Sequence, residues 1–417
     1  VIGLGPNLFY GTGIPAAILI LRAKGSKPAE RRGKVLFINA DRDYGEGRAQ
    51  NHLRPQDEEK ITATYRNFAD VDGFARVVTL DELADNDFNC NIRRYADNAP
   101  PPEPHDVRAH LHGGVPMTEI DDAKDLLERA GLDPDTLFAD RGDGYADWRH
   151  TATSTDGRDA AHRIINQAVA QRAANSPWPQ WWAEIVEPLL RQLPDDGLRV
   201  GQRRQLVKDF RDHMVAAGVD RFAGAGMAAT WWEESFHELQ TAASRGWKAV
   251  IDAWLTTTEA SQDDKNAPHL ADQTVIKLLA GPQLAERTHL ADEHVRLDAK
   301  IKTVSDHSLT LAKIKALKSA RARAKKKLKA IDASLLATAR QTLNAMPPAD
   351  APTQAIGVLR SRIEKLVTDH TATIERSILA WYDNLTNKYG TTLRHLETQR
   401  DTATARLNQH LKDLGYG

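Results

Sequence analysis

The stretch from residue 6 to residue 21, PNLFYGTGIPAAILIL, brings together residue types suited to holding a small ligand. Two are short polar residues, two are adjacent aromatics that could offer a stacking face, and two are glycines that permit close backbone approach. These candidates are Asn7, Phe9, Tyr10, Gly11, Thr12 and Gly13. The same pattern fits a structural hairpin that binds nothing, and spacing alone leaves both interpretations open.

A second candidate is a strongly basic run from Lys313 to Lys329, which holds nine lysines or arginines and no acidic residue. A run of this kind is typical of a solvated helix face. It also suits salt-dependent contact with phosphate groups or with an acidic partner. Lys325, Lys326 and Lys327 form its densest part and are our candidates for contact with DNA or a partner protein.

Three further sequence signals give weaker support for a functional site. Phe222–Gly226 (FAGAG) has the glycine spacing of a nucleotide or cofactor loop, but no apolar strand precedes it, so we expect a turn between helices. The linker histidines His105, His110 and His112 have no cysteine or carboxylate shell, and we expect no metal site. Cys90 is expected to be a small buried side chain.

Residues 1–98 are expected to be mixed α/β and to position the first candidate. Apolar runs predict strands at Val1–Leu4, Ile14–Leu21, Val35–Asn39 and Phe74–Leu80. Ile14–Leu21 should be a buried strand that neighbours Val35–Asn39 in an antiparallel arrangement. A helix is predicted over residues 55–69, because Pro55 suits a first turn and three acids follow it. Asp81–Ala84 should form one helical turn, and Asn86–Asp97 should be irregular or extended.

The rest of the chain is expected to be mainly helical. Residues 99–118 contain PPPEP and predict an extended linker with weak packing. Residues 119–282 hold eight of the nine tryptophans and predict one packed helical domain.

Residues 283–417 contain two long helical patterns, 283–346 and 354–415, separated by Pro347, Pro348 and Pro352. Each pattern has a narrow apolar seam with steps of three and four, which favours a coiled coil. The seam positions are Leu290, Leu297, Ile301, Val304 and Leu311, then Ile356, Leu359, Ile363, Leu366, Leu393, Leu396, Ala403 and Leu407. We expect one antiparallel hairpin whose two helices each run on the order of 90 Å.

The composition of the chain limits the classes of protein to which it could belong. The 417 residues carry a formal net charge of −1, which excludes a globally basic nucleic-acid binder but not a local basic patch. The single cysteine excludes a disulfide framework within the chain and favours a reducing, cytoplasmic compartment. No apolar run is long enough to span a membrane. Because the sequence opens on Val1 inside an apolar run, we expect it to be a fragment or to have lost an upstream region.

Three segments, in order, resemble the modification subunits of type I restriction–modification systems. They are Pro6–Leu21, Lys34–Leu53 (KVLFINADRDYGEGRAQNHL) and Asp81–Asp97 (DELADNDFNCNIRRYAD). The resemblance covers about the first quarter of the chain. It implies that residues 1–98 are the last strands of a doubly wound, S-adenosylmethionine-dependent methyltransferase sheet.

The resemblance also implies a function. Such subunits transfer a methyl group from S-adenosylmethionine to adenine N6 in DNA, with the target base flipped out and stacked on aromatic groups. The loop from Asn7 to Gly13 would then lie near the target-base pocket. The implied partners are DNA, a specificity subunit that packs on C-terminal helices, and a restriction (nuclease) subunit, all acting in host defence. A non-catalytic assembly or DNA-binding module is the alternative.

The sequence departs from the family pattern in two ways. Cys90 and Arg93 stand where the family usually has Leu and Pro, and Arg93 with Arg94 adds charge that could contact phosphate. More importantly, the catalytic Asn-Pro-Pro-Phe motif is absent, because neither double-proline site (near Pro100 and Pro347) is followed by an aromatic residue. We therefore expect this chain alone to be inactive.

Overall fold

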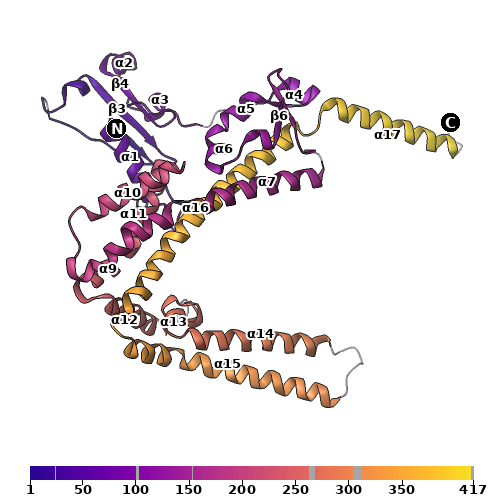
Figure 1. The fold of residues 1–417 in the computed structure, drawn as a ribbon. Coiled ribbons are helices and arrows are strands. Elements are labelled where there is room, and N and C mark those ends of the chain that lie inside the picture. The colour runs from indigo at the N-terminus through magenta and orange to yellow at the C-terminus, as the bar shows by residue number, and fades with distance from the viewer. Residues whose placement is uncertain (24, 100–102, 153, 263–267, 304–310, 415–417) are drawn as a thin grey trace. The chain divides into compact units, whose positions relative to one another are not determined.

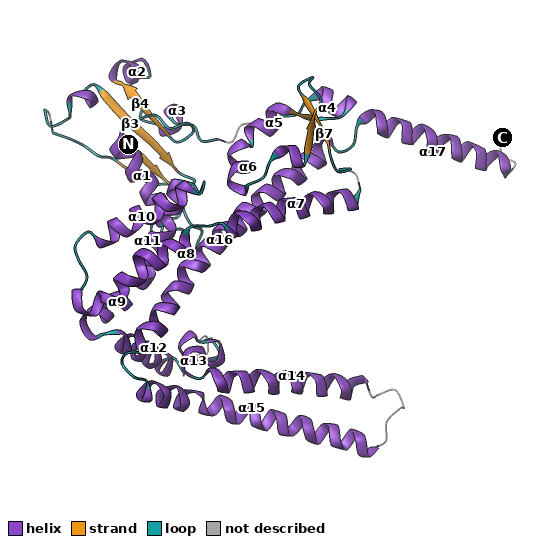
Figure 2. Ribbon diagram, in the orientation of Figure 1, coloured by secondary structure: helices purple, strands orange, loops and turns teal. Residues whose placement is uncertain are grey.

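The computed structural model describes the whole chain except residues 24, 100–102, 153, 263–267, 304–310 and 415–417 (Figure 1). Side chains are also left undescribed at 303, 311 and 312. Helices predominate over strands (Figure 2). The chain divides into two compact units. Unit 1 comprises residues 1–181, 203–232 and 363–417, and unit 2 comprises residues 182–202 and 233–362.

The N-terminal part of unit 1 is a four-stranded sheet of order β2-β1-β3-β4. β1 (Ile2–Leu4) pairs antiparallel with β2 (Ala17–Ile18) and parallel with β3 (Lys34–Ala40), which pairs antiparallel with β4 (Ala75–Thr79). The remaining elements of this part are η1 (Ala29–Arg31), α1 (Pro55–Asn67), α2 (Leu80–Asp85) and α3 (Ile92–Tyr95).

Strand alternation explains how this sheet is covered. Side chains of β3 point alternately to the two faces, so Leu36 and Ile38 pack with Ile61 of α1. Phe37 points to the other face and stacks on Tyr95 of α3, with ring centroids 4.4 Å apart. The predictions of strands at β1, β3 and β4, of the helix begun by Pro55 and of the helical turn at Asp81–Ala84 are confirmed. Residues 86–97 also contain the short helix α3, where an irregular segment was expected.

The prediction for Ile14–Leu21 is wrong. Only Ala17 and Ile18 form a strand, both are exposed, and the strand neighbours β1 and not β3. Pro15 cannot donate a backbone hydrogen bond, so the ladder does not extend toward the preceding loop. Leu19 and Leu21 are also exposed, because the face of this edge strand has nothing packed over it among the described residues.

A second small sheet follows in unit 1, in the order β5-β7-β6. Its strands are β5 (Val115–Pro116), β6 (Phe138–Asp140) and β7 (Tyr145–Trp148). The helices around it are α4 (Val107–His112), α5 (Met117–Asp122), α6 (Lys124–Ala130), η2 (Pro134–Thr136) and α7 (Thr155–Ala174). The expected extended linker is therefore wrong over residues 107–118, where Ala109 and Val115 are fully buried. Residues 100–102 of that linker lie outside the described part.

Two late helices complete unit 1. α16 (Ala351–Tyr389) lends Ile378, Tyr382 and Leu385 to the same buried core as residues 109–169. α17 (Leu393–Asp413) follows a break at Gly390, where a Cβ atom would lie 2.4 Å from the Thr386 carbonyl oxygen. Unit 1 also includes α8 (Trp178–Trp181), α10 (Gln202–Ala216) from Arg203 onward and the first half of α11 (Arg221–Arg245).

The regular elements of unit 2 are all helical among its described residues. It contains the π-helical turn η3 (Trp182–Val186), α9 (Glu187–Asp196), the second half of α11, α12 (Trp247–Ala260), η4 (Leu270–Asp272), α13 (Thr274–Leu279), α14 (Gly281–Thr303), α15 (Leu311–Ala345) and the start of α16. Within this unit, Arg340 of α15 forms ion pairs with Asp252 and Glu259 of α12.

The expected hairpin differs in its partners and its lengths. α14 and α15, both from the first long pattern, lie side by side, so that pattern contains two paired helices and not one (Figures 1 and 2). The second pattern is divided at Gly390 into α16 and α17. Val304, one of the expected seam positions, lies outside the described residues.

The two units also cut across the expected domain boundaries at residues 98, 118 and 282. The tryptophan-rich region does not form one core, because Trp181 belongs to unit 1 and Trp182 to unit 2. α11 and α16 each continue from one unit into the other. Among the helices of the described ranges, none combines the length and apolar character that crossing a bilayer requires.

Candidate functional site

The candidate site is the loop of residues 5–13, which leaves β1 and returns toward β2. Phe9 and Thr12 form an isolated antiparallel bridge, and Gly11 has φ of 78°. Residues 9–12 therefore form a tight turn with Tyr10 at its tip. The Tyr10 side chain is 94% exposed and that of Phe9 is 53% exposed, so both aromatics face solvent. Thr12 Oγ1 accepts a hydrogen bond of 3.1 Å from the backbone N–H of Ile14.

Two amide residues anchor the base of this loop. The Asn51 side chain donates to the Pro6 carbonyl (2.9 Å), and its backbone N–H donates to the Asn7 carbonyl (2.9 Å). Gln50 donates to the Leu8 carbonyl (3.3 Å). Asn7 adopts a left-handed backbone (φ 56°), which asparagine tolerates better than most residues. The loop is thus held at three successive carbonyls.

Close packing fixes the start of the loop. A Cβ atom on Gly5 would lie 2.3 Å from Cδ1 of Tyr44, so the Tyr44 ring packs directly on the glycine backbone. No atom lies within 4 Å of a Cβ built on Gly11 or Gly13. Gly11 is therefore needed for its positive φ, and neither glycine marks a crowded ligand contact in the structure.

A polar cluster lies where β3 ends. Buried Asn39 donates to the Ala96 carbonyl (2.8 Å), and Asp41 accepts hydrogen bonds from Arg93 (2.7 and 3.1 Å) and Asn98. Burial tends to raise the pKa of Asp41, but the bonds from Asn98 and Arg93 outweigh it and leave that pKa below its ordinary value. The cluster ties the segment around α3 to the sheet.

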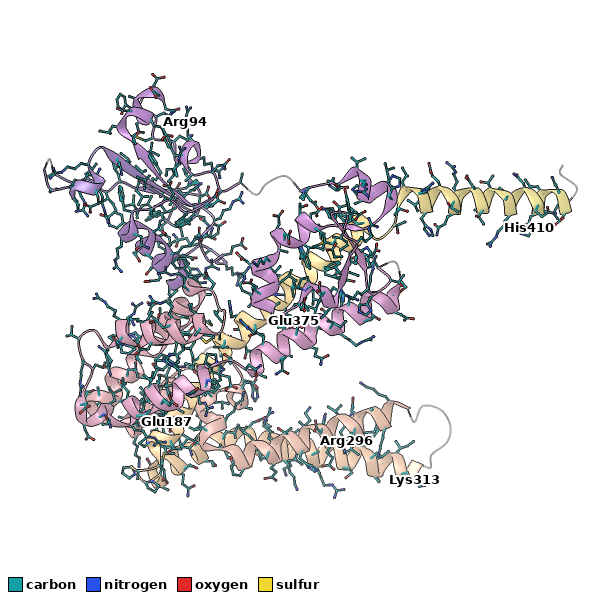
Figure 3. The ribbon with its side chains drawn as sticks, turned by 45° about the horizontal axis from the view of Figure 1, so that its top comes forward. Arg94, Glu187, Arg296, Lys313, Glu375 and His410 are labelled. Atoms are coloured by element: carbon teal, nitrogen blue, oxygen red, sulfur yellow. The ribbon has the colours of Figure 1, made fainter. Side chains whose placement is uncertain are left out.

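The structure does not bring the predicted site residues together in one pocket. The six loop residues share one turn, whereas Arg93 is held by Asp41 and exposed Arg94 donates to Asn86 (2.8 Å). Figure 3 labels Arg94 on the N-terminal part of unit 1 that contains the four-stranded sheet. Lys325, Lys326 and Lys327 are exposed on α15, in unit 2.

Sequence reasoning did not assign site roles to Tyr44, Gln50, Asn51, Asn39 or Asp41. A signal was available for Asn39 and Asp41, because polar residues at the carboxyl end of a buried strand often mark functional edges of α/β sheets. No comparable signal exists for Tyr44, whose role depends on the close approach of Gly5.

Two of the three weaker candidates differ from expectation. Cys90 is exposed, not buried, and its thiol lies 3.6 Å from the Phe88 carbonyl. Phe222–Gly226 is not a turn but the beginning of helix α11. His105 and His110 stack with ring centroids 5.5 Å apart, and no cluster of three or more metal-binding side chains occurs among the described residues.

An apolar groove of about 350 Å³ lies beside β2. Its lining includes the exposed run Leu19–Leu21 together with Leu36, Tyr65 and Phe68. The rim is basic, with Lys27 and Arg31. Exposed apolar surface of this kind marks a place where another segment or chain packs.

Comparison with known proteins assigns this sheet region to a class. The family model for N-6 DNA methylases matches residues 1–103. The expected resemblance is therefore confirmed for this region, which is related to adenine-specific methyltransferase subunits of type I restriction–modification systems. Residues 104–417 lie outside the range of that model.

The individual relatives agree. The "Type I restriction enzyme MjaVIII methylase subunit" of Methanocaldococcus jannaschii is 44% identical over 98 residues, covering 23% of this chain and 17% of the relative. The MjaVII methylase subunit of the same organism is 39% identical over 114 residues, covering 27% of this chain and 19% of the relative. The chain thus spans less than a fifth of the length of these relatives.

Solved structures also match. Among them is the type I restriction-modification system methyltransferase subunit from Streptococcus thermophilus, with 36% sequence identity and a TM-score of 0.21. The match covers 23% of this chain and 19% of that chain.

Proposed function

We propose that this chain is the C-terminal part of a DNA adenine-N6 methyltransferase (modification) subunit of a type I restriction–modification system. The observation that supports this most is that residues 1–103, including the anchored loop, match the N-6 DNA methylase family. The proposed substrate is adenine in DNA, and the methyl donor is S-adenosylmethionine.

The loop would act on the target base. Tyr10 and Phe9 project from a turn whose backbone is held by Asn51 and Gln50, so their rings are presented on a fixed support. An adenine flipped from the duplex could stack on either ring, and base stacking on aromatic side chains is worth about 1–3 kcal/mol per base. Arg94 of α3, which is exposed, is the proposed phosphate contact.

The residues of this chain do not fit the cofactor. The sequence whose glycine spacing resembles a cofactor loop, Phe222–Gly226, is helical, whereas a cofactor loop needs a strand before it and a helix after it. We derive no catalytic step through S-adenosylmethionine from these residues. Methyl transfer would require a further cofactor-binding segment that carries the Asn-Pro-Pro-Phe motif.

The apolar groove beside β2 supports such a segment. Leu19, Ile20 and Leu21 are exposed directly after the edge strand β2, within the region that matches the methylases. Burial of apolar surface stabilises association by roughly 25 cal/mol per Å² before the entropic cost of binding is subtracted. The cofactor-binding segment would cover this groove and extend the sheet at β2.

A specificity subunit is the proposed partner of α17. Every residue of α17 is exposed. Leu396 and Leu407 lie on one face, at spacing suited to a partner helix. The same observation favours the second candidate function, a non-catalytic assembly module. The restriction subunit remains a partner proposed from the resemblance alone.

A complementation assay tests the proposed function. The full chain is co-expressed with the part of a type I methylase subunit that precedes the matched segment and with that system's specificity subunit. Methylation of adenine N6 in target DNA is then measured with and without the chain. We expect methyl transfer only when the chain is present.

The assay separates the two candidate functions. An assembled complex without methyl transfer, while the intact methylase is active under the same conditions, would support the assembly module and contradict the proposed enzyme role. No assembly at all would contradict both.

A further inference from the structure

One face of α15 carries positive charge only. Five cations project from the outward side of the helix over about four turns, and we call them the α15 basic stripe: Lys315, Lys318, Arg323, Lys326 and Lys329. They lie opposite the residues that are wholly or partly buried toward α14: Ile314, Leu317, Ala324 and Leu328. At 1.5 Å per residue the stripe extends about 21 Å.

The stripe is not neutralised. The inward cation Arg321 pairs with Asp298 of α14 at 2.6 Å, and Arg287 of α14 pairs with Asp332 of α15 at 2.6 Å. None of the five stripe residues makes an ion pair within the part of the chain that the structure describes. Their charges are therefore available to a partner.

The neighbouring helix shows that this is a property of α15 and not of the hairpin. α14 carries exposed charges of both signs: Glu286, Asp292, Glu293, Arg296, Lys300 and Lys302. Figure 3 labels Arg296 on α14 and Lys313 near the beginning of α15. A surface chosen only for solubility is expected to mix signs, as α14 does.

The side chains between the cations define the partner. They are small, namely Ala316, Ser319, Ala322 and Ala330, and the outward face has no aromatic or large apolar side chain. A protein interface usually needs such anchors in its centre and is depleted in lysine. Insertion into a lipid surface needs a free apolar face, whereas that of α15 is packed on α14.

We propose that the α15 basic stripe binds the sugar–phosphate backbone of duplex DNA without regard to sequence. Small residues let the helix approach the backbone closely, and four of the five cations are lysines, which act as point charges and do not select bases. Among Lys325, Lys326 and Lys327, which are spread about 100° apart around the helix, only Lys326 lies at the centre of this face. The inference does not depend on the match of residues 1–103.

The salt dependence of DNA binding tests this proposal. The full chain is titrated with a fluorescent 30-base-pair duplex of mixed sequence between 50 and 200 mM salt. The test variant is Lys315→Gln, Lys318→Gln, Lys326→Gln and Lys329→Gln, since glutamine retains helix propensity. Each phosphate contact contributes about −0.9 to the slope of log K against log[salt], so the variant should reduce the slope by about 3.6.

The matched control removes the same charge elsewhere, at four exposed lysines: Lys124→Gln, Lys208→Gln, Lys277→Gln and Lys365→Gln. For this control, the slope of log K against log[salt] should differ from that of the original chain by no more than the contribution of about one phosphate contact. Equal slopes for the original chain and the stripe variant would overturn the proposal. So would a stripe variant that loses binding to polyglutamate while its DNA slope is unchanged, because the partner would then be an acidic protein. Helical content, measured by circular dichroism, verifies that each variant is folded.

Discussion

Tyr10 and Asn51 belong to the same loop but contribute differently to it. Asn51 holds the loop through a side-chain hydrogen bond to the Pro6 carbonyl, whereas Tyr10 touches almost nothing. Their substitution therefore separates stability from base binding.

We expect Asn51→Ala to lower the free energy of unfolding by about 1–2 kcal/mol, because the Pro6 carbonyl loses its donor. Tyr10→Ala should change it by less than about 0.5 kcal/mol, as is usual at exposed sites. Chemical denaturation measures both.

In the complementation assay Tyr10→Ala should lower methylation at least 10-fold, and Tyr10→Phe, which keeps the ring, should restore most of it. Full activity of Tyr10→Ala would remove Tyr10 from the proposed base pocket.

Two buried tyrosines of α16 give a prediction for alkaline pH. Burial raises the pKa of Tyr382 to about 12, and burial with a hydrogen bond to Glu119 raises the pKa of Tyr389 to about 12. Each phenol has a pKa near 10 when unfolded. The neutral folded forms thus contribute stability that is complete below pH 10 and is lost as the pH rises through 12.

The variant Tyr382→Phe isolates one of these groups. Its hydroxyl has no hydrogen-bond partner among the described residues, so removal should not reduce stability at pH 7 and should increase it by up to about 1 kcal/mol. Between pH 10 and 12 the free energy of unfolding of the variant should fall less steeply with pH. The difference in slope should correspond to the release of about one proton on unfolding. Urea denaturation at several pH values measures this, and an unchanged slope would contradict it.

Helices and strands were predicted correctly where the signal lay entirely within the segment itself. β3 and α1 were predicted because a short apolar run and a Pro55 start with acids are complete in themselves. Ile14–Leu21 was mispredicted because apolarity shows which residues favour burial and not what covers them. The division of the first long pattern into α14 and α15 was not predicted either, because its apolar residues continue at heptad spacing through Val304 to Leu311.

α17 supports a prediction at the same scale. Leu396→Glu with Leu407→Glu should weaken binding to a specificity subunit more than about 10-fold, because a charge would enter the apolar seam. Thr398→Glu with Ala405→Glu adds the same charge on the opposite side of the helix and should have little effect. Pull-down or interferometry measures binding, and unchanged melting temperatures verify that all four substitutions leave the fold intact. Equal weakening by both pairs would argue for simple charge repulsion.

For the whole molecule, we expect no binding of S-adenosylmethionine by this chain alone. The reason is that its glycine-rich sequence is the beginning of helix α11 and offers no loop of free backbone donors. Isothermal titration calorimetry at micromolar concentrations measures this, with an intact type I methylase subunit as the positive control. A dissociation constant in the micromolar range would contradict the expectation and would require a binding mode outside the glycine-rich loops.

At this scale the sequence predicted the helical majority and the family of the first region, but not the division into units. Trp181 and Trp182 are adjacent in the chain and belong to different units, so clustering of tryptophans could not reveal which core each one fills. Nor could heptad spacing show that Ile378 and Tyr382, which lie in the second long pattern, fill the core around a small sheet formed much earlier in the chain.

That long-range core bears on how the chain is made. The core around Ala109, Val115 and Ile165 closes only when Tyr382 and Tyr389 reach it. At a synthesis rate of about 5–20 residues per second, the ribosome needs on the order of 10 to 40 s to deliver those side chains. The middle of unit 1 therefore keeps apolar surface exposed during synthesis and can finish folding only after residues 382–389 have been translated.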